Sequence, residues 1–358
     1  MEEVSFMAID LPIPPEDLAQ IQGMLRSENP FCSSFPDEPL YSVMLYHQQK
    51  HLHGTETRML LDRNIYARLL RLAKGHPASD DYRIPAAVMG FAQWAGILLE
   101  PNMAIYEGCS TQQGEEPARD IAFFRAFDNL HPSILVDIAL GRTKQLSAPL
   151  NMQPVMEELR SIGQPLRDFS IVYPLVLKIG LLELGRGRQA ERMRHFLEWM
   201  HTEWYYSPPV TIFAAMCFSD NAPRGVLKHL RSDDRQRALK GVRNAAWDLA
   251  YITYWGQLLK RQDREKCLWI FCSLDKALRR VARSILATDD DIGVAVRGSL
   301  CELMGEAAGA NIYDYYAKLQ ACLEDPERAI NRTRGEERTT HHRKTEASLE
   351  RALLNGGA

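Results

Sequence analysis

The stretch that most constrains the fold runs from Gly241 to Leu278 and joins a helical pattern to a short apolar run. In its first part, apolar residues recur at spacings of three and four, which is typical of a helix with one buried face. A charged turn follows, and then the run Leu268–Cys272, which is rich in bulky side chains. Such a run predicts a strand covered on both faces, as in a parallel sheet. The sequence therefore predicts an α/β fold.

Two acids in this stretch are candidates for chemistry. Asp248 lies within the predicted helix, and Asp275 stands where the next helix, Lys276–Leu286, begins. Each has a structural explanation, because helical Asp residues are common and an Asp at a helix start accepts first-turn amides. The same order of strand, acid and helix occurs upstream, where Met59–Leu61 precedes Asp62. Because the carboxyl ends of parallel strands line one edge of a sheet, Asp62 and Asp275 are expected to meet there at a metal ion.

The length of 358 residues allows two domains, or one domain with a large insertion. A net charge of −3 argues against a protein that coats nucleic acid by bulk electrostatics, but it leaves room for a local basic groove. The acidic N-terminus is unlike a signal peptide. The most apolar later run, Phe169–Leu184, contains Pro174 and Lys178, which favours a buried element over a membrane span. Seven cysteines without C-x-x-C spacing predict reduced thiols and a cytoplasmic protein with no membrane association.

Breaks in the pattern divide the chain into six parts. The predicted parts are an N-terminal extension (1–56), the first part of an α/β core (57–110), a helical insertion or cap (111–205), the second part of the core (206–290), C-terminal helices (291–323) and a charged, mobile tail (324–358). The run Val210–Phe218 fits either a strand or a helix, since periodicity does not separate the two.

The order of these elements resembles the PIN-like nuclease domain. The matching residues are Leu60-Leu61-Asp62, Trp247-Asp248-Leu249-Ala250 and Ile270-Phe271-Cys272-Ser273-Leu274-Asp275. Members of that family are α/β/α sandwiches with a central parallel sheet, in which three or four acids hold Mg²⁺ or Mn²⁺ to hydrolyse phosphodiester bonds, most often in RNA. The resemblance implies such a sandwich here with a large, mostly helical insertion, and it extends poorly over residues 110 to 210. It further implies a toxin or defence effector restrained by a protein partner.

The predicted metal ligands are carboxylates, because hard divalent cations prefer oxygen donors. Asp62 and Asp275 are expected to bind directly, Asp248 directly or through water, and Glu107 as a ligand or as an orienting group. Glu107 is preferred to Glu100 because Pro101 interrupts the helix between them. The bound metal is expected to lower the pKa of a water molecule and to offset phosphate charge. The residues expected to orient ligands or bound water are Asn64, Asn244 and Ser273.

A basic run precedes the helix that carries Asp248. Its residues predicted to contact nucleic-acid phosphates are Arg224, Lys228, Arg231, Lys240 and Arg243, and the alternative is a solvated charged face. Arg279, Arg280 and Arg283 are expected to extend the same surface. RNA is the expected substrate in preference to DNA. The sequence predicts no particular oligomeric state. The rival prediction is a catalytically inactive PIN-like scaffold that binds RNA or a partner protein.

Overall fold

The computed structural model describes residues 14–109, 115–154, 167–220, 226–286 and 292–356. They divide into two compact units. The sheet unit comprises residues 1–163 and 261–274, and the helical unit comprises residues 164–260 and 275–358. Across the described residues the chain is mostly helical, and its strands form one small mixed sheet in the sheet unit. This composition agrees with the α/β class predicted from the sequence, while the predicted α/β/α sandwich around a central parallel sheet stays a prediction.

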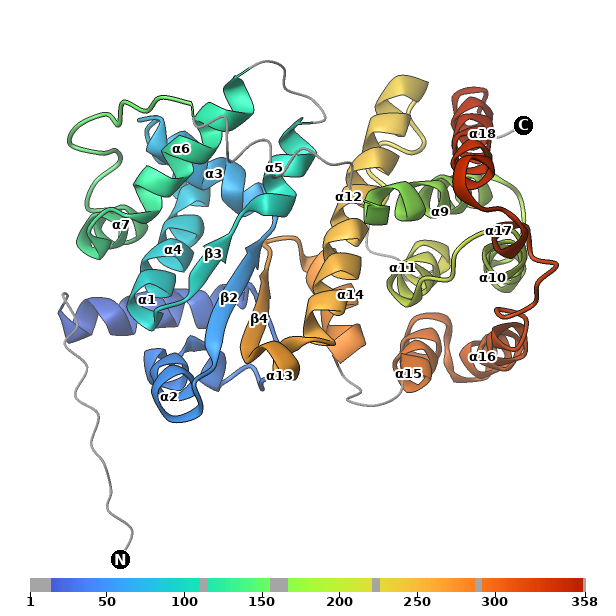
Figure 1. The fold of residues 1–358 in the computed structure, drawn as a ribbon, viewed down its shortest axis with the longest axis horizontal. Helices are drawn as coiled ribbons and strands as arrows, with labels where there is room; N and C mark the ends of the chain where they lie inside the picture. The colour runs from blue at the N-terminus through green and yellow to red at the C-terminus, as the bar shows by residue number, and fades with distance from the viewer. Residues whose placement is uncertain (1–13, 110–114, 155–166, 221–225, 287–291, 357–358) are drawn as a thin grey trace, which may run out of the picture. The chain divides into compact units, whose positions relative to one another are not determined.

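The sheet has the strand order β1-β4-β2-β3. Figure 1 shows β2 between β4 and β3. Its strands are β1 (Phe31–Cys32), β2 (Glu56–Leu61), β3 (Leu98–Glu100) and β4 (Cys267–Cys272). β2 runs parallel to both β3 and β4, while β1 pairs antiparallel with β4. Leu61 lies opposite Cys272, so β2 and β4 end level with each other. The residues that follow, Asp62 and Ser273, therefore emerge at the same edge.

The two central strands form because their side chains are buried. All six residues of β4 are buried, and the last three residues of β2 are buried as well. The helices α2 (Val43–His53) and α5 (Asn102–Cys109) contact β2, and α4 (Arg83–Ala95) contacts β3. The other helices of this unit are α1 (Pro15–Glu28), α3 (Arg63–Ala73), α6 (Glu116–Asp128), α7 (Pro132–Ala139), α13 (Gln262–Glu265) and the short 3₁₀ turns Pro39–Tyr41 and Asp80–Tyr82.

The helical unit contains only helices among its described residues. They are α9 (Arg167–Leu184), α10 (Gln189–Glu203), α11 (Pro208–Phe218), α12 (Arg235–Leu259), α14 (Lys276–Leu286), α15 (Ile292–Met304), α16 (Glu306–Gln320), α17 (Ala329–Arg332) and α18 (Gly335–Leu354). α12 packs on α9 and α18, and α15 packs on α16. The apolar face predicted for α12 is buried, with Val242, Ala246 and Trp255 inaccessible to solvent.

The run Val210–Phe218, for which the sequence left strand and helix open, lies in the helix α11, and all of its residues are buried. One local prediction needs correction. The segment predicted to be a mobile tail forms α18, and its Leu353 is fully buried. The helix α4 ends at Ala95, and β3 begins three residues later. In the part of the chain that the structure describes, no helix has the length and apolar character needed to span a membrane.

Candidate functional site

Asp62 is the best-defined polar group at the carboxyl edge of the sheet. The residue is fully buried, and its backbone amide donates to the carbonyl of Cys272 at 2.9 Å, which continues the pairing of β2 with β4. Asp62 also caps α3, since its Oδ1 accepts the amide of Asn64 at 3.4 Å. The cap involves one carboxylate oxygen of Asp62 and leaves the other to further contacts.

That second oxygen is held by the neighbouring strand end. Ser273 Oγ donates to Asp62 Oδ2 at 2.7 Å, and the Asn64 side-chain amide approaches the same oxygen at 3.4 Å. Ser273 is itself fully buried, and its amide donates to the carbonyl of Pro30 at 3.1 Å. Residues separated by more than 200 positions in the chain thus fix one carboxylate at the sheet edge. Both contacts come from residues expected to orient this acid.

The predicted second carboxylate lies on a helix tied to the same edge. Glu107 is half-buried in α5, and α5 contacts both β2 and α3. Arg63, directly after Asp62, donates to the carbonyl of Ala104 in α5. The alternative acid, Glu100, ends β3 and accepts from Arg58 at 2.9 Å. Glu100 is thus part of an ion pair, and Glu107 stays the predicted ligand.

The other two predicted ligands belong to the helical unit. Asp248 is half-buried on α12, one turn after the exposed Asn244. Asp275 caps α14, since its Oδ1 accepts the amides of Ala277 and Leu278 at 2.9 and 3.1 Å. Its Oδ2 lies 3.9 Å from Lys228 Nζ. The structural explanation given for Asp275 therefore holds for one of its oxygens.

The chemistry of these side chains suits a hard cation, because carboxylates are the usual ligands of Mg²⁺ and Mn²⁺. Among the described residues, however, no group of three or more His, Cys, Asp or Glu side chains is placed so that it could hold a metal ion. Of the four predicted ligands, Asp62 and Glu107 belong to one unit and Asp248 and Asp275 to the other. The four-acid centre therefore stays a prediction.

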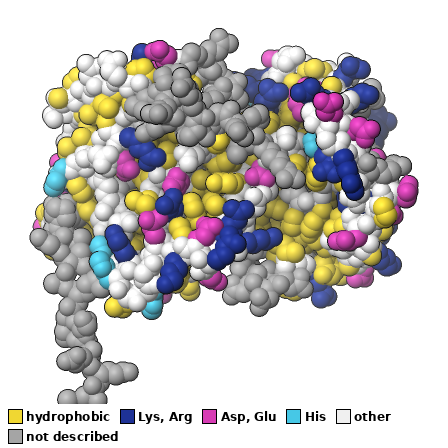
Figure 2. Space-filling view, viewed as in Figure 1, with side chains coloured by type: hydrophobic (Ala, Val, Ile, Leu, Met, Phe, Trp, Pro, Cys, Tyr) yellow, Lys and Arg dark blue, Asp and Glu magenta, His cyan; other side chains and the backbone are white. Residues whose placement is uncertain are grey.

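Acidic side chains hold much of the predicted basic run. Arg231 pairs with Glu183 at 3.0 Å, and Arg243 pairs with Glu350 at 3.3 Å. Lys228 and Lys240 are exposed, while Arg224 lies outside the described residues. On the face drawn in Figure 2, Lys and Arg side chains are interspersed with Asp and Glu. Lys276 was not among the predicted basic residues. Its spacing of three, four and seven from Arg279, Arg280 and Arg283 nevertheless places all four on one face of α14.

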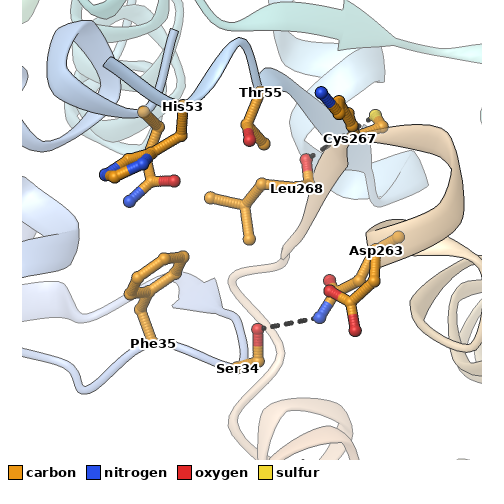
Figure 3. Close-up of a pocket in the computed structure, with 10 residues that line it drawn as sticks. Ser34, Phe35, His53, Thr55, Asp263, Cys267 and Leu268 are labelled. Atoms are coloured by element: carbon orange, nitrogen blue, oxygen red, sulfur yellow. Dashed lines mark hydrogen bonds between the residues drawn. The ribbon is translucent and has the colours of Figure 1, made fainter.

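A cavity of about 310 Å³ opens at the opposite, amino end of the parallel strands (Figure 3). His53, Thr55 and Asp263 are among its lining residues, with Cys267 at the start of β4. Burial raises the pKa of the Cys267 thiol to about 11, so the thiol stays protonated near neutral pH and is a poor nucleophile. Because open parallel sheets bind ligands at the carboxyl ends of their strands, the edge that carries Asp62 is the better candidate site.

Comparison with protein-family models, curated proteins and solved structures finds no match. The candidate site therefore rests on its residues and geometry, together with the short motifs that resemble the PIN-like domain.

Proposed function

We propose that this protein is a metal-dependent nuclease of the PIN-like kind, which hydrolyses phosphodiester bonds in nucleic acid. RNA is the proposed substrate in preference to DNA. The observation that carries the proposal is the fully buried Asp62 carboxylate at the carboxyl end of β2, held by Ser273 from the end of the adjacent parallel strand. Burying a carboxylate costs free energy unless hydrogen bonds or charges offset it. A pair of side chains that fixes such a group at a ligand-binding edge is best explained by a site.

The proposed ligands are Asp62, Glu107, Asp248 and Asp275. Asp275 follows Ser273 by two residues, so the chain itself keeps their Cα atoms within about 7 Å. Glu107 lies on α5, which contacts β2. When bound, Mg²⁺ or Mn²⁺ would supply a water of lowered pKa and stabilise charge on the phosphate. In this proposal Asp62 is the ligand on the rigid strand, and Ser273 and Asn64 fix the direction of its oxygens.

A second function is favoured by one observation. Among the described residues, no group of three or more His, Cys, Asp or Glu side chains is placed so that it could hold a metal ion. A PIN-like scaffold that binds RNA or a partner protein without cutting would have this property. The two functions differ in one respect that can be measured, because both require binding but only the first requires hydrolysis that depends on Asp62.

The test is cleavage of end-labelled single-stranded RNA, duplex RNA and DNA by the purified protein in Mn²⁺, in Mg²⁺ and in EDTA. We expect single-stranded RNA to be cut in Mn²⁺, and cutting to cease in EDTA and in the Asp62→Asn and Asp275→Asn variants. Asp263→Asn is the matched control, since this exposed acid of the sheet unit lies outside the proposed set. Circular dichroism would verify folding. Binding without any cleavage would support the scaffold, and undiminished cleavage by Asp62→Asn would refute the assigned centre.

A further inference from the structure

The first turns of α14 border a strongly basic cavity in the helical unit. The cavity measures about 490 Å³, and its lining residues are Lys276, Arg279, Arg280, Arg283, Ser284 and Glu302. Four of these side chains are cationic and one is anionic, so the lining carries a net charge of +3 at neutral pH. A lining of this charge favours an anionic ligand.

The four cations share one helical face over seven residues, which corresponds to about 10 Å along the axis. Lys276 is exposed, Arg280 and Arg283 are half-buried, and Arg279 is only 5% exposed. Guanidinium groups bind phosphate through two parallel hydrogen bonds, which makes clustered arginines suited to phosphate recognition. A row of this length can face more than one phosphate of a strand.

The acid in the cavity comes from the neighbouring helix. Glu302 on α15 accepts from Arg280 at 2.8 Å, and both side chains are substantially exposed, at 64% and 39%. Because exposed ion pairs contribute little free energy, a phosphate can displace this carboxylate from the guanidinium. Glu302 therefore acts as a weak internal competitor for the anion.

We propose that this α14 cavity binds the phosphate backbone of the single-stranded nucleic acid on which the protein acts. The inference rests on the proposed function for the identity of the ligand, and it adds the place where the strand is held. Asp275 caps the same helix and directly precedes Lys276. A strand bound along this face would thus lie beside one of the proposed metal ligands. Its binding requires no metal, since the cavity supplies the positive charge.

The experiment measures binding of fluorescein-labelled, 20-nucleotide oligouridine RNA to the whole protein by anisotropy, in EDTA and at several salt concentrations. The triple variant Lys276→Gln, Arg280→Gln and Arg283→Gln is expected to bind at least tenfold more weakly. Its logarithmic salt slope is expected to fall by about 2, since each lost phosphate contact removes roughly 0.7 for single strands. Glu302→Gln is expected to bind severalfold more tightly. Lys318→Gln, which removes one positive charge from an exposed residue of α16, is expected to bind as the wild type does.

Unchanged affinity in both the triple variant and Glu302→Gln would overturn the inference. Competition by polyglutamate as effective as that by unlabelled RNA would also overturn it, because an acidic polypeptide would then be the better ligand. Should the triple variant fail to fold, the opposite shifts of Glu302→Gln and of Arg283→Gln alone test the same point. Loss of cleavage in Asp62→Asn without loss of binding leaves the inference standing. Wild-type protein that binds RNA through this cavity but never cuts it refutes only the proposed hydrolysis.

Discussion

The sheet unit and the helical unit satisfy their buried polar side chains in different ways. In the helical unit, two buried side chains bond to main-chain carbonyls: His201 Nδ1 lies 2.7 Å from the carbonyl of Leu197, and Ser219 Oγ donates to that of Leu303 at 2.6 Å. His201 Nε2 also lies 2.9 Å from the side-chain nitrogen of Gln320. In the sheet unit, buried Asp62 is held by the side chain of Ser273. Polar groups of the first kind complete helix packing, whereas the second kind positions a carboxylate at an edge where ligands bind.

Two other buried acids of the sheet unit sharpen the contrast. Asp17 pairs with Arg142, and Asp120 pairs with Lys74. In each case a cation compensates for the buried charge, as structural acids require. The side-chain contacts of Asp62 given above come from the Ser273 hydroxyl and from the amides of Asn64. The comparison shows that buried acids elsewhere in the sheet unit form ion pairs that support packing, while the candidate carboxylate lies at the sheet edge.

The largest expected effect tests packing in the helical unit. At Gly309 on α16, an added Cβ would lie 2.5 Å from the Cα and N of Cys301 on α15. Because helix backbone cannot move aside easily, Gly309→Ala is expected to lower the free energy of unfolding by about 3 kcal/mol. Gly298→Ala on α15 is the matched control, since its Cβ would meet no atom within 4 Å and Ala favours a helix by about 1 kcal/mol. Urea denaturation measures both. Equal effects would show that the close approach contributes nothing.

The next effect is on the pH dependence of stability, whose sign is expected to differ between a buried histidine of the helical unit and a buried aspartate of the sheet unit. Burial lowers the pKa of His201 in the helical unit to about 4, while unfolded His titrates near 6.5. Stability from the neutral ring is complete above the unfolded pKa and is lost as the pH falls towards 4. Between pH 7 and 4.5 the wild type is expected to lose roughly 2–3 kcal/mol more than His201→Gln. Urea titrations at the two pH values measure this difference, and equal losses would contradict it.

Asp128 in the sheet unit gives the opposite sign. Burial raises its pKa to about 6, so the folded state takes up a proton before the unfolded state does as the pH falls. The destabilisation caused by its buried charge is present above pH 6 and disappears on acidification. Asp128→Asn is therefore expected to stabilise the protein more at pH 7 than at pH 4.5, in urea titrations at both values. A gain that is independent of pH would count against the raised pKa.

A smaller effect is expected at the sheet edge. Ser273→Ala removes the 2.7 Å hydrogen bond to a buried carboxylate and is expected to cost about 2 kcal/mol of unfolding free energy. Ser34→Ala, an exposed serine of the same unit, is the control and is expected to change stability by less than about 0.5 kcal/mol. Thermal and urea denaturation check the pair. Equal costs would mean that the Ser273 contact does not hold Asp62 in solution.

The sequence predicted the two central strands because β4 and the second half of β2 are apolar runs, each followed by a polar residue. It missed β1 and β3, since two or three residues carry no period and their pairing depends on the neighbouring strand. The helix α18 was missed because its sequence is mostly charged. Its stability comes from contacts that sequence does not display, such as those of Leu353, whose Cδ1 approaches Gly180.

The candidate site was also predicted only in part, because sequence shows contacts set by sheet geometry but not contacts between distant helices. Asp62 and Ser273 each follow a strand, so sheet geometry alone brings them together. The ion pairs that hold Arg231 and Arg243 join positions about 50 and 100 residues apart, and no local pattern reveals them. The α14 cavity was predicted only in part. Lys276 directly follows Asp275 in the sequence, and only the helical spacing places it on the same face as the three arginines.

The most direct test of a metal centre at the sheet edge is a Mn²⁺ titration followed by electron paramagnetic resonance, with wild type, Asp62→Asn and the control Asp263→Asn. We expect the wild type and the control to bind Mn²⁺ alike, and Asp62→Asn to bind at least tenfold more weakly while keeping its circular dichroism spectrum. Identical Mn²⁺ binding by all three proteins would contradict a metal centre built on Asp62.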